Sequence, residues 1–133
     1  MFLSWLQPWH LTHYLEHTVV QPIGLVLLII SLILNGLAYR EFKKSQTPHA
    51  PFMKPNVLIK NGVFSVSRNP VYFALVLSEF GLAFILDMVW FLPSALILWM
   101  TLHYLIIPDE EKILERIFKE KYTHYKQHTR RWF

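Results

Sequence analysis

The chain contains no cysteine in its 133 residues, and this absence excludes several kinds of chemistry. Disulfide bonds, a thiol nucleophile and cysteine-ligated metal sites are all ruled out. Glycine is scarce as well, with four residues and no G-x-G sequence, so the phosphate-binding turn of a Rossmann domain is excluded. No lysine or arginine precedes Arg40, and a cleaved signal peptide needs a basic start, so we expect none here.

Apolar residues make up 53% of the chain, and the basic residues fall in two blocks. Six of the 13 lysines and arginines lie in residues 40–70, and the other seven lie in residues 108–133. The net charge of +4 together with the long apolar runs favours membrane lipids over nucleic acid as partners. By the positive-inside rule, both basic blocks face the cytoplasm. We therefore expect one integral membrane domain with both basic blocks on the cytoplasmic side.

The apolar residues form segments of the length that membrane-spanning helices need. Val19–Tyr39 is the first convincing span, because a bilayer core of roughly 30 Å takes about 20 helical residues. Val71–Leu86 and Met88–Ile107 then form a helical hairpin that turns at Asp87. The aromatic N-terminal segment is either an interfacial helix or a weak fourth span. The expected architecture is all-α with three to four transmembrane helices, in the order 1–18 interfacial or weak span, 19–39 span, 40–70 cytoplasmic loop, 71–107 hairpin and 108–133 cytoplasmic tail.

Three histidines in the N-terminal segment have helical spacing. His10, His13 and His17 fall at i, i+3 and i+7, so they share one face of a helix and form a candidate metal site. A wet polar face on an interfacial helix gives the same pattern without a metal. We favour the polar face, and we expect no metal site.

Arg68 lies where a polar, proline-rich loop meets the second apolar segment. Pro70 suits the first turn of a helix, because its fixed φ is helical and its missing N–H is not needed there. Asn69 is then the expected N-cap, with its side chain bound to a free amide of the first turn. Arg68 would hold an anion at the positive end of the helix dipole. The alternative is an ordinary basic residue at the membrane boundary.

The tail is expected to form one amphipathic helix from Pro108 to about Gln127. At 100° per residue, Glu110 falls near the centre of its apolar stripe, and Glu111 and Asp109 fall on opposite flanks. A carboxylate on such a stripe needs a cation, either Arg68 or the ammonium of a ligand. A simple helix-starting role for the carboxylate is the alternative. The stripe consists of Ile113, Leu114, Ile117 and Phe118.

Two ionisable residues lie within the expected spans. Glu79 is in the middle of the second span, where a carboxyl group is costly and often functional. A hydrogen bond to Asn35 or His103 on a neighbouring span would satisfy it without a function, and both interpretations remain open. Glu79 or His103 could also take a proton from a substrate.

The sequence G-V-F-S-V-S-R-N-P-V-Y, followed by an apolar hairpin and then I-P-D-E-E-K-I-L-E-R-I-F-K-E-K-Y-T-H-Y-K-Q-H-T-R-R-W-F, resembles the isoprenylcysteine carboxyl methyltransferase family. Its broader relatives include the phospholipid methyltransferases and many bacterial membrane methyltransferases, which implies a location in a bacterial inner membrane. The resemblance covers about residues 51–133, and R-N-P-x-Y, E-E-x-x-L, Y-x-x-Y and R-R-W carry it together. Two positions depart from the family pattern: Gly62-Val63-Phe64 replaces Gly-Pro-Tyr, and Lys119 replaces the glycine of F-G-x-x-Y.

This resemblance implies an enzyme that transfers a methyl group from S-adenosylmethionine to a lipophilic or membrane-associated acceptor. The cofactor would bind at the cytoplasmic membrane face, between the hairpin and the C-terminal segment. The sterol reductases, which use NADPH, share a similar arginine–proline–tyrosine pattern and provide one alternative. A membrane scaffold subunit without catalysis provides another. The implied cofactor-binding residues are Arg68, Asn69, Pro70, Tyr72, Glu110, Glu111, Arg130, Arg131 and Trp132.

Overall fold

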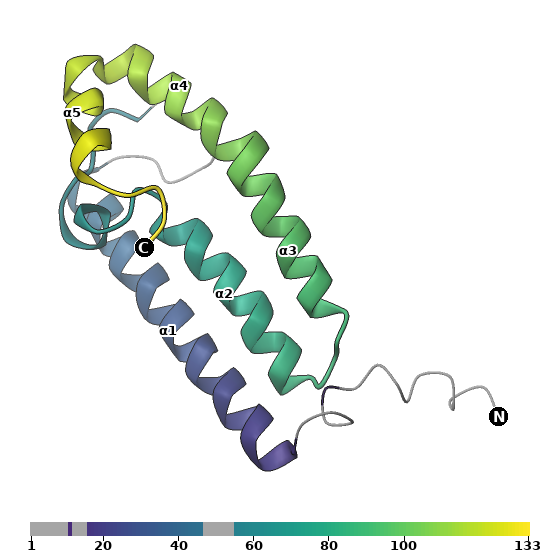
Figure 1. Ribbon diagram of the computed structural model, residues 1–133. Helices are drawn as coiled ribbons and strands as arrows, with labels where there is room; N and C mark the ends of the chain where they lie inside the picture. Colours follow the sequence, from purple (N-terminus) through teal and green to yellow (C-terminus); the bar gives the residue numbers. More distant parts are fainter. Residues whose placement is uncertain (1–10, 12–15, 47–54) are drawn as a thin grey trace.

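A computed structural model describes Leu11, residues 16–46 and residues 55–133 of the chain. These residues are all-helical, apart from one isolated bridge between Ser67 and Arg130. In Figure 1 the long helices lie side by side, and the C-terminal residues fold back against one end of the bundle. The elements in chain order are α1 (His17–Lys44), the 3₁₀ helix η3 (Gly62–Ser65), α2 (Pro70–Ile85), α3 (Phe91–Thr101), the π-helix η4 (Leu102–Ile106), α4 (Ile107–Phe118) and α5 (Glu120–His128).

Helices α1 and α2 pack closely because small residues lie between them. A Cβ added at Gly24 of α1 would lie 2.8 Å from the carbonyl oxygen of Gly81 on α2. Seven residues further along α1, the buried Ser31 hydroxyl donates to the Ala74 carbonyl of α2 at 2.8 Å. Small residues and an interhelical hydrogen bond are the usual means of joining helices where water provides no hydrophobic drive.

Helix α2 and the following helix form the expected hairpin. The turn between them lies at Asp87, which adopts a positive φ of 55°. Helix α2 begins with Pro70 in its first turn, as the sequence predicts. Asn69 precedes it as N-cap, but the expected side-chain capping bond is absent, so that prediction was wrong.

The third rod is longer than expected. The tail helix does not start afresh at Pro108, because α3, η4 and α4 form one helix from Phe91 to Phe118 (Figure 1). The π-helix lies directly before the proline, and within it the N–H of Ile107 reaches back five residues to the Leu102 carbonyl. A proline lacks the N–H that continues an α-helix and crowds the preceding turn, and a wider π turn relieves that crowding.

The rod ends at Lys119, whereas the sequence predicted a helix that continues to about Gln127. Lys119 has φ 47° and ψ −123°, a backbone conformation that favours glycine, and α5 starts at the next residue. This is the position at which the resembled family has its glycine. A lysine therefore adopts a conformation suited to glycine at this position.

Two helices in the described residues are long and apolar enough to cross a membrane, Thr18–Lys44 and Phe91–Phe118. Helix α2 is a shorter apolar helix of 16 residues. Many apolar side chains on α1 and α3 point away from the bundle, as in Leu32, which is 70% exposed, and Ile97, which is 64% exposed. Such faces are suited to a lipid environment.

Some predicted features lie outside the described residues. The N-terminal segment is described only at Leu11 and from Glu16 onward, so the question of a fourth span is not addressed. The side chains of His10, His13 and His17 are also not described. The first residues of the expected 40–70 loop belong to α1, which continues to Lys44. The described part of the chain then runs to Gln46 and starts again at Pro55.

The strained turn at Lys119 gives a test of the fold. We predict that Lys119→Gly stabilises the protein by about 1 kcal/mol or more, because glycine adopts this conformation without a Cβ penalty. Lys121→Gly is the control: Lys121 is exposed in the first turn of α5, where glycine costs up to about 1 kcal/mol. Thermal unfolding in detergent, followed by helical circular dichroism, measures both variants. Equal losses of stability would show that Lys119 is not strained.

Candidate functional site

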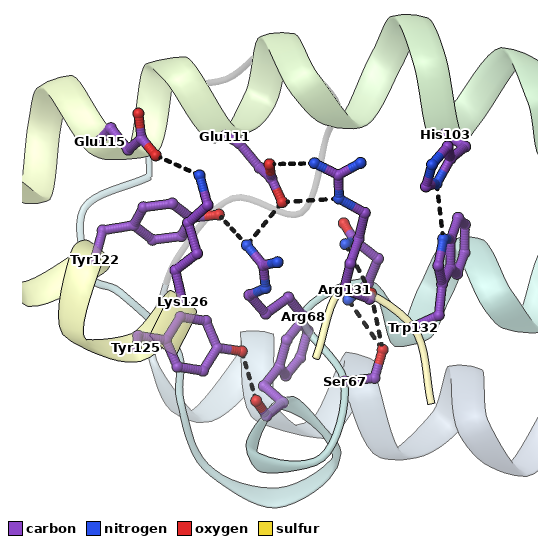
Figure 2. A network of polar contacts seen from close by, with 12 residues as sticks. Ser67, Arg68, His103, Glu111, Glu115, Tyr122, Tyr125, Lys126, Arg131 and Trp132 are labelled. Atoms are coloured by element: carbon purple, nitrogen blue, oxygen red, sulfur yellow. Dashed lines mark hydrogen bonds and ion pairs between the residues drawn. The ribbon is translucent and has the colours of Figure 1, made fainter. Parts of the chain in front are cut away.

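The residues that the motifs single out meet at one end of the bundle. This end contains the C-terminus of α1, the start of α2, helices α4 and α5, and the last residues of the chain (Figure 1). Figure 2 shows the polar network there, with Glu111 reaching down from α4 towards two arginines. The segments that supply the network are far apart in sequence, and each is positioned by backbone contacts.

The last residues of the chain run beside the segment that precedes α2. The Arg68 N–H donates to the Arg130 carbonyl at 2.9 Å, and Ser67 pairs with Arg130 as a parallel bridge. The Asn69 side chain donates to the Arg131 carbonyl at 3.0 Å. Asn69 is thus occupied in holding the C-terminal segment, which explains why it does not cap α2. These bonds fix the Arg68 and Arg131 side chains next to each other.

Glu111 is the centre of the network. Its carboxylate accepts from Arg68 Nη1 at 2.7 Å, and it accepts two bonds from Arg131, from Nε at 3.2 Å and from Nη2 at 2.7 Å. The side chains of Glu111 and Arg68 are 8% and 10% exposed, and that of Arg131 is 28% exposed. A two-pronged arginine contact and a second guanidinium satisfy this carboxylate. Two positive charges against one negative charge leave the cluster with a surplus of +1.

Arg68 is not fully satisfied by these contacts. Its Nε is buried and has no hydrogen-bond partner in the described part of the chain. Its Nη1 also reaches the Tyr122 hydroxyl at 3.4 Å. Burial raises the pKa of the Tyr122 phenol and Glu111 raises it further, although Arg68 lowers it, so this group is neutral near pH 7. Tyr122 cannot cancel the surplus charge.

Glu110, the neighbour of Glu111, has a different partner. Its carboxylate accepts from the Tyr72 hydroxyl at 2.6 Å, across the gap between α4 and the first turn of α2. Glu110 is partly buried, and in the described residues it has no ion pair. The sequence placed Glu110 at the centre of the apolar stripe, with Arg68 or the ammonium of a ligand as its partner. In the structure Glu111 is the buried carboxylate, and Arg68 pairs with it instead.

Trp132 anchors the C-terminal segment to the third rod. Its indole N–H donates to His103 Nδ1 at 3.0 Å, which places the proton of a neutral imidazole on Nε2. The His103 ring also stacks on Trp99, with centroids 5.1 Å apart. Next to Trp132, Phe133 packs on Phe73 of α2 at 4.8 Å. The last residues are therefore held by both helices of the hairpin.

Helix α5 is held by a buried tyrosine that the motif Y-x-x-Y contains. The Tyr125 hydroxyl donates to the Phe64 carbonyl in η3. The buried Glu41 carboxylate lies against Gly62, the first residue of η3. Gly62 has a positive φ of 61°. Sequence reasoning did not select Glu41. Its position three residues before Lys44 gave no signal beyond an ordinary helix-surface pair, which it also forms, at 3.0 Å.

The predicted cofactor-binding residues thus separate into groups. Pro70 is buried at the start of α2, and Arg130 is exposed and contributes its backbone to the bridge. Among the described residues no group of three metal-ligating side chains occurs.

Glu79 lies outside the cluster and accepts from Ser94 on α3 at 2.7 Å, rather than from Asn35 or His103. The residues that converge are Arg68, Asn69, Glu111, Arg131 and Trp132, with Tyr72 and Glu110 beside them.

The Glu111 cluster predicts a large asymmetry in stability. Glu111→Gln leaves the buried Arg68 and the partly exposed Arg131 without their counter-charge, and breaking a buried pair in this way costs about 3–5 kcal/mol. Glu115→Gln is the matched control, because its pair with Lys126 is 44% and 41% exposed and is worth at most about 1 kcal/mol. Unfolding midpoints in detergent compare the two. Adding Arg131→Gln to Glu111→Gln should recover part of the loss, and equal small shifts for both single variants would contradict the assigned pairing.

The sequence was also compared with known proteins. A family model described as phospholipid methyltransferase matches residues 20–121. The match includes α1, the Arg68–Tyr72 region and both glutamates, and it ends before Arg131 and Trp132. No curated protein and no solved structure matches the chain. The chain therefore belongs to the phospholipid methyltransferase family, a family of membrane methyltransferases.

Proposed function

We propose that this protein transfers a methyl group from S-adenosylmethionine to a lipophilic or membrane-associated acceptor. The observation that carries the proposal is the buried cluster of Arg68, Glu111 and Arg131, with its surplus positive charge and the unpaired Arg68 Nε. A buried donor without a partner is costly, and such groups in native proteins are commonly explained by a ligand or an ion. The family gives the reaction class.

The residues present fit the chemical groups of the cofactor. A carboxylate suits the unpaired Arg68 Nε and the surplus charge of the cluster. A cationic group suits Glu110, whose partner Tyr72 is neutral as a hydrogen-bond donor. Aromatic faces for a base or a cation lie close by, at Tyr72 and Trp132. When bound, S-adenosylmethionine supplies an activated methyl group for in-line displacement.

The chain's own residues would act mainly by positioning and by excluding water. Arg68 and Arg131 are preorganised by Glu111, so they need not rearrange to hold an anion. His103 is not placed to act as a base in this arrangement, because its Nδ1 accepts from Trp132 and its Nε2 carries the proton. Glu79 lies in the hairpin with Ser94.

We also propose that three helices cross the membrane and that the site end faces the cytoplasm. The C-terminus of α1, the start of α2 and helices α4 and α5 share one end of the bundle (Figure 1). The described lysines and arginines all lie in residues 40–68 and 112–131, while the α2–α3 turn carries none. This asymmetry is that of the positive-inside rule. Helix α2, at 16 residues and roughly 24 Å, would cross with a thinned or adapted bilayer.

Ligand binding by Arg68 variants tests the proposed function. In detergent or nanodiscs the protein should bind S-adenosylmethionine and its demethylated product, S-adenosylhomocysteine. We predict that Arg68→Ala abolishes both and that Arg68→Lys restores binding only partly, because a point ammonium cannot make a two-pronged contact. Isothermal titration measures the affinities. Arg116→Ala is the control, because Arg116 is exposed on α4.

The same titration separates the alternatives. NADPH bound tightly, with no response to S-adenosylmethionine, would replace the proposal with a reductase. A folded protein that binds none of the three would be a scaffold. Unchanged affinities in Arg68→Ala would show that the cofactor binds elsewhere.

Single cysteines test the orientation, since the natural chain has none to interfere. We predict that Ser45→Cys and Gln127→Cys react with a membrane-impermeant maleimide only after the cells are opened. Met88→Cys, in the exposed turn between α2 and α3, should react in intact cells. Labelling of Ser45→Cys or Gln127→Cys from outside would reverse the topology.

A further inference from the structure

The two adjacent glutamates of α4 differ sharply in their electrostatic surroundings. Glu111 is paired with two guanidinium groups. Glu110 receives one hydrogen bond from a neutral phenol, and within the described residues no lysine, arginine or histidine pairs with it. The site thus has a positive pole around Arg68 and Arg131 and a negative pole at Glu110.

The two poles lie close together. Glu110 and Glu111 are consecutive on one helix, and their partners Tyr72 and Arg68 are four residues apart at the start of α2. A helical turn rises roughly 5.4 Å, so both poles are within reach of one small ligand. A partly buried carboxylate is most stable beside a cation, and the described residues provide none that pairs with Glu110.

S-adenosylmethionine and S-adenosylhomocysteine differ in charge at one atom. Both carry a carboxylate and an ammonium, which cancel, but only the cofactor carries a sulfonium. A site with a positive pole alone would disfavour the sulfonium, and it would hold the neutral product more tightly than the cofactor. A negative charge near the positive pole would offset this preference and favour the cofactor over the product.

We propose that Glu110 is the specificity-determining residue that distinguishes the cofactor from its product, by compensating the positive charge of the sulfonium. This inference rests on the proposed function. Tyr72 is the positioning residue, because its hydroxyl holds the Glu110 carboxylate against the first turn of α2. The arginines, in contrast, hold the groups that cofactor and product share.

The test compares the two ligands on the same variants by isothermal titration in nanodiscs. Glu110→Gln keeps the size and the hydrogen-bond acceptor but removes the charge. We expect the affinity for S-adenosylmethionine to fall at least about tenfold, and the affinity for S-adenosylhomocysteine to change less than about twofold. Tyr72→Phe should shift the ratio of affinities in the same direction by a smaller factor. Retained product binding also shows that the variant is folded.

Asp109→Asn is the matched control. It removes the same charge from the preceding residue of α4, but Asp109 is exposed and paired with Lys112. We expect it to leave the ratio of affinities unchanged, which separates a local contact from a general effect of net charge.

Each other outcome rejects the inference in a recognisable way. Equal losses for both ligands in Glu110→Gln would assign Glu110 to the shared ammonium. Unchanged affinities for both would place the carboxylate outside the site. Wild-type protein that binds neither ligand would reject the proposed function itself, whereas wild-type binding with an unchanged ratio rejects only the role of Glu110.

Discussion

The attraction of two arginines to Glu111 is the interaction on which the arrangement of this end of the protein depends. Arg68 comes from the loop before α2, Arg131 comes from the last residues of the chain, and Glu111 comes from the third rod. One carboxylate therefore joins three segments that are far apart in the sequence. Hydrogen bonds between residues 67–69 and residues 130–131 surround this contact. They hold the positively charged side chains of Arg68 and Arg131 close together. Such a cluster is stable only while all its members are present.

Much of the architecture follows from the sequence, because apolar length and charge placement are read directly. The α1 and α2 helices, the turn at Asp87 and the gathering of Arg68, Glu111, Arg131 and Trp132 agree with expectation. The choice between Glu110 and Glu111 does not follow from the apolar stripe. On a helix near a membrane an apolar side chain can face lipid as well as protein, and Ile117 is in fact 38% exposed. The apolar stripe is therefore wider than the buried face of the helix. The centre of the stripe, near Glu110, does not coincide with the centre of the buried face.

Two backbone details were also beyond the sequence. Pro108 normally marks a helix start, and only the π-helix before it lets the rod continue. Lysine favours a helix, so the sequence predicts that the helix continues through Lys119, yet this residue adopts a conformation suited to glycine. In both places a tertiary constraint overrides a local preference. Glu111 and Arg131 can meet only if α4 continues in line with α3 and the chain then reverses towards α2.

The unequal lengths of the helices have a further consequence for access. Helix α2 has 16 residues, while the helix of α1 has 28 and the rod from Phe91 to Phe118 also has 28. The first turn of α2, which holds Tyr72 and directly follows Arg68, is thus recessed between two longer neighbours. A molecule with its hydrophobic chains anchored in the bilayer could approach this level sideways, between helices, without leaving the lipid. A water-soluble molecule would instead descend from the aqueous end, so that two reactants of opposite solubility could meet there from different directions.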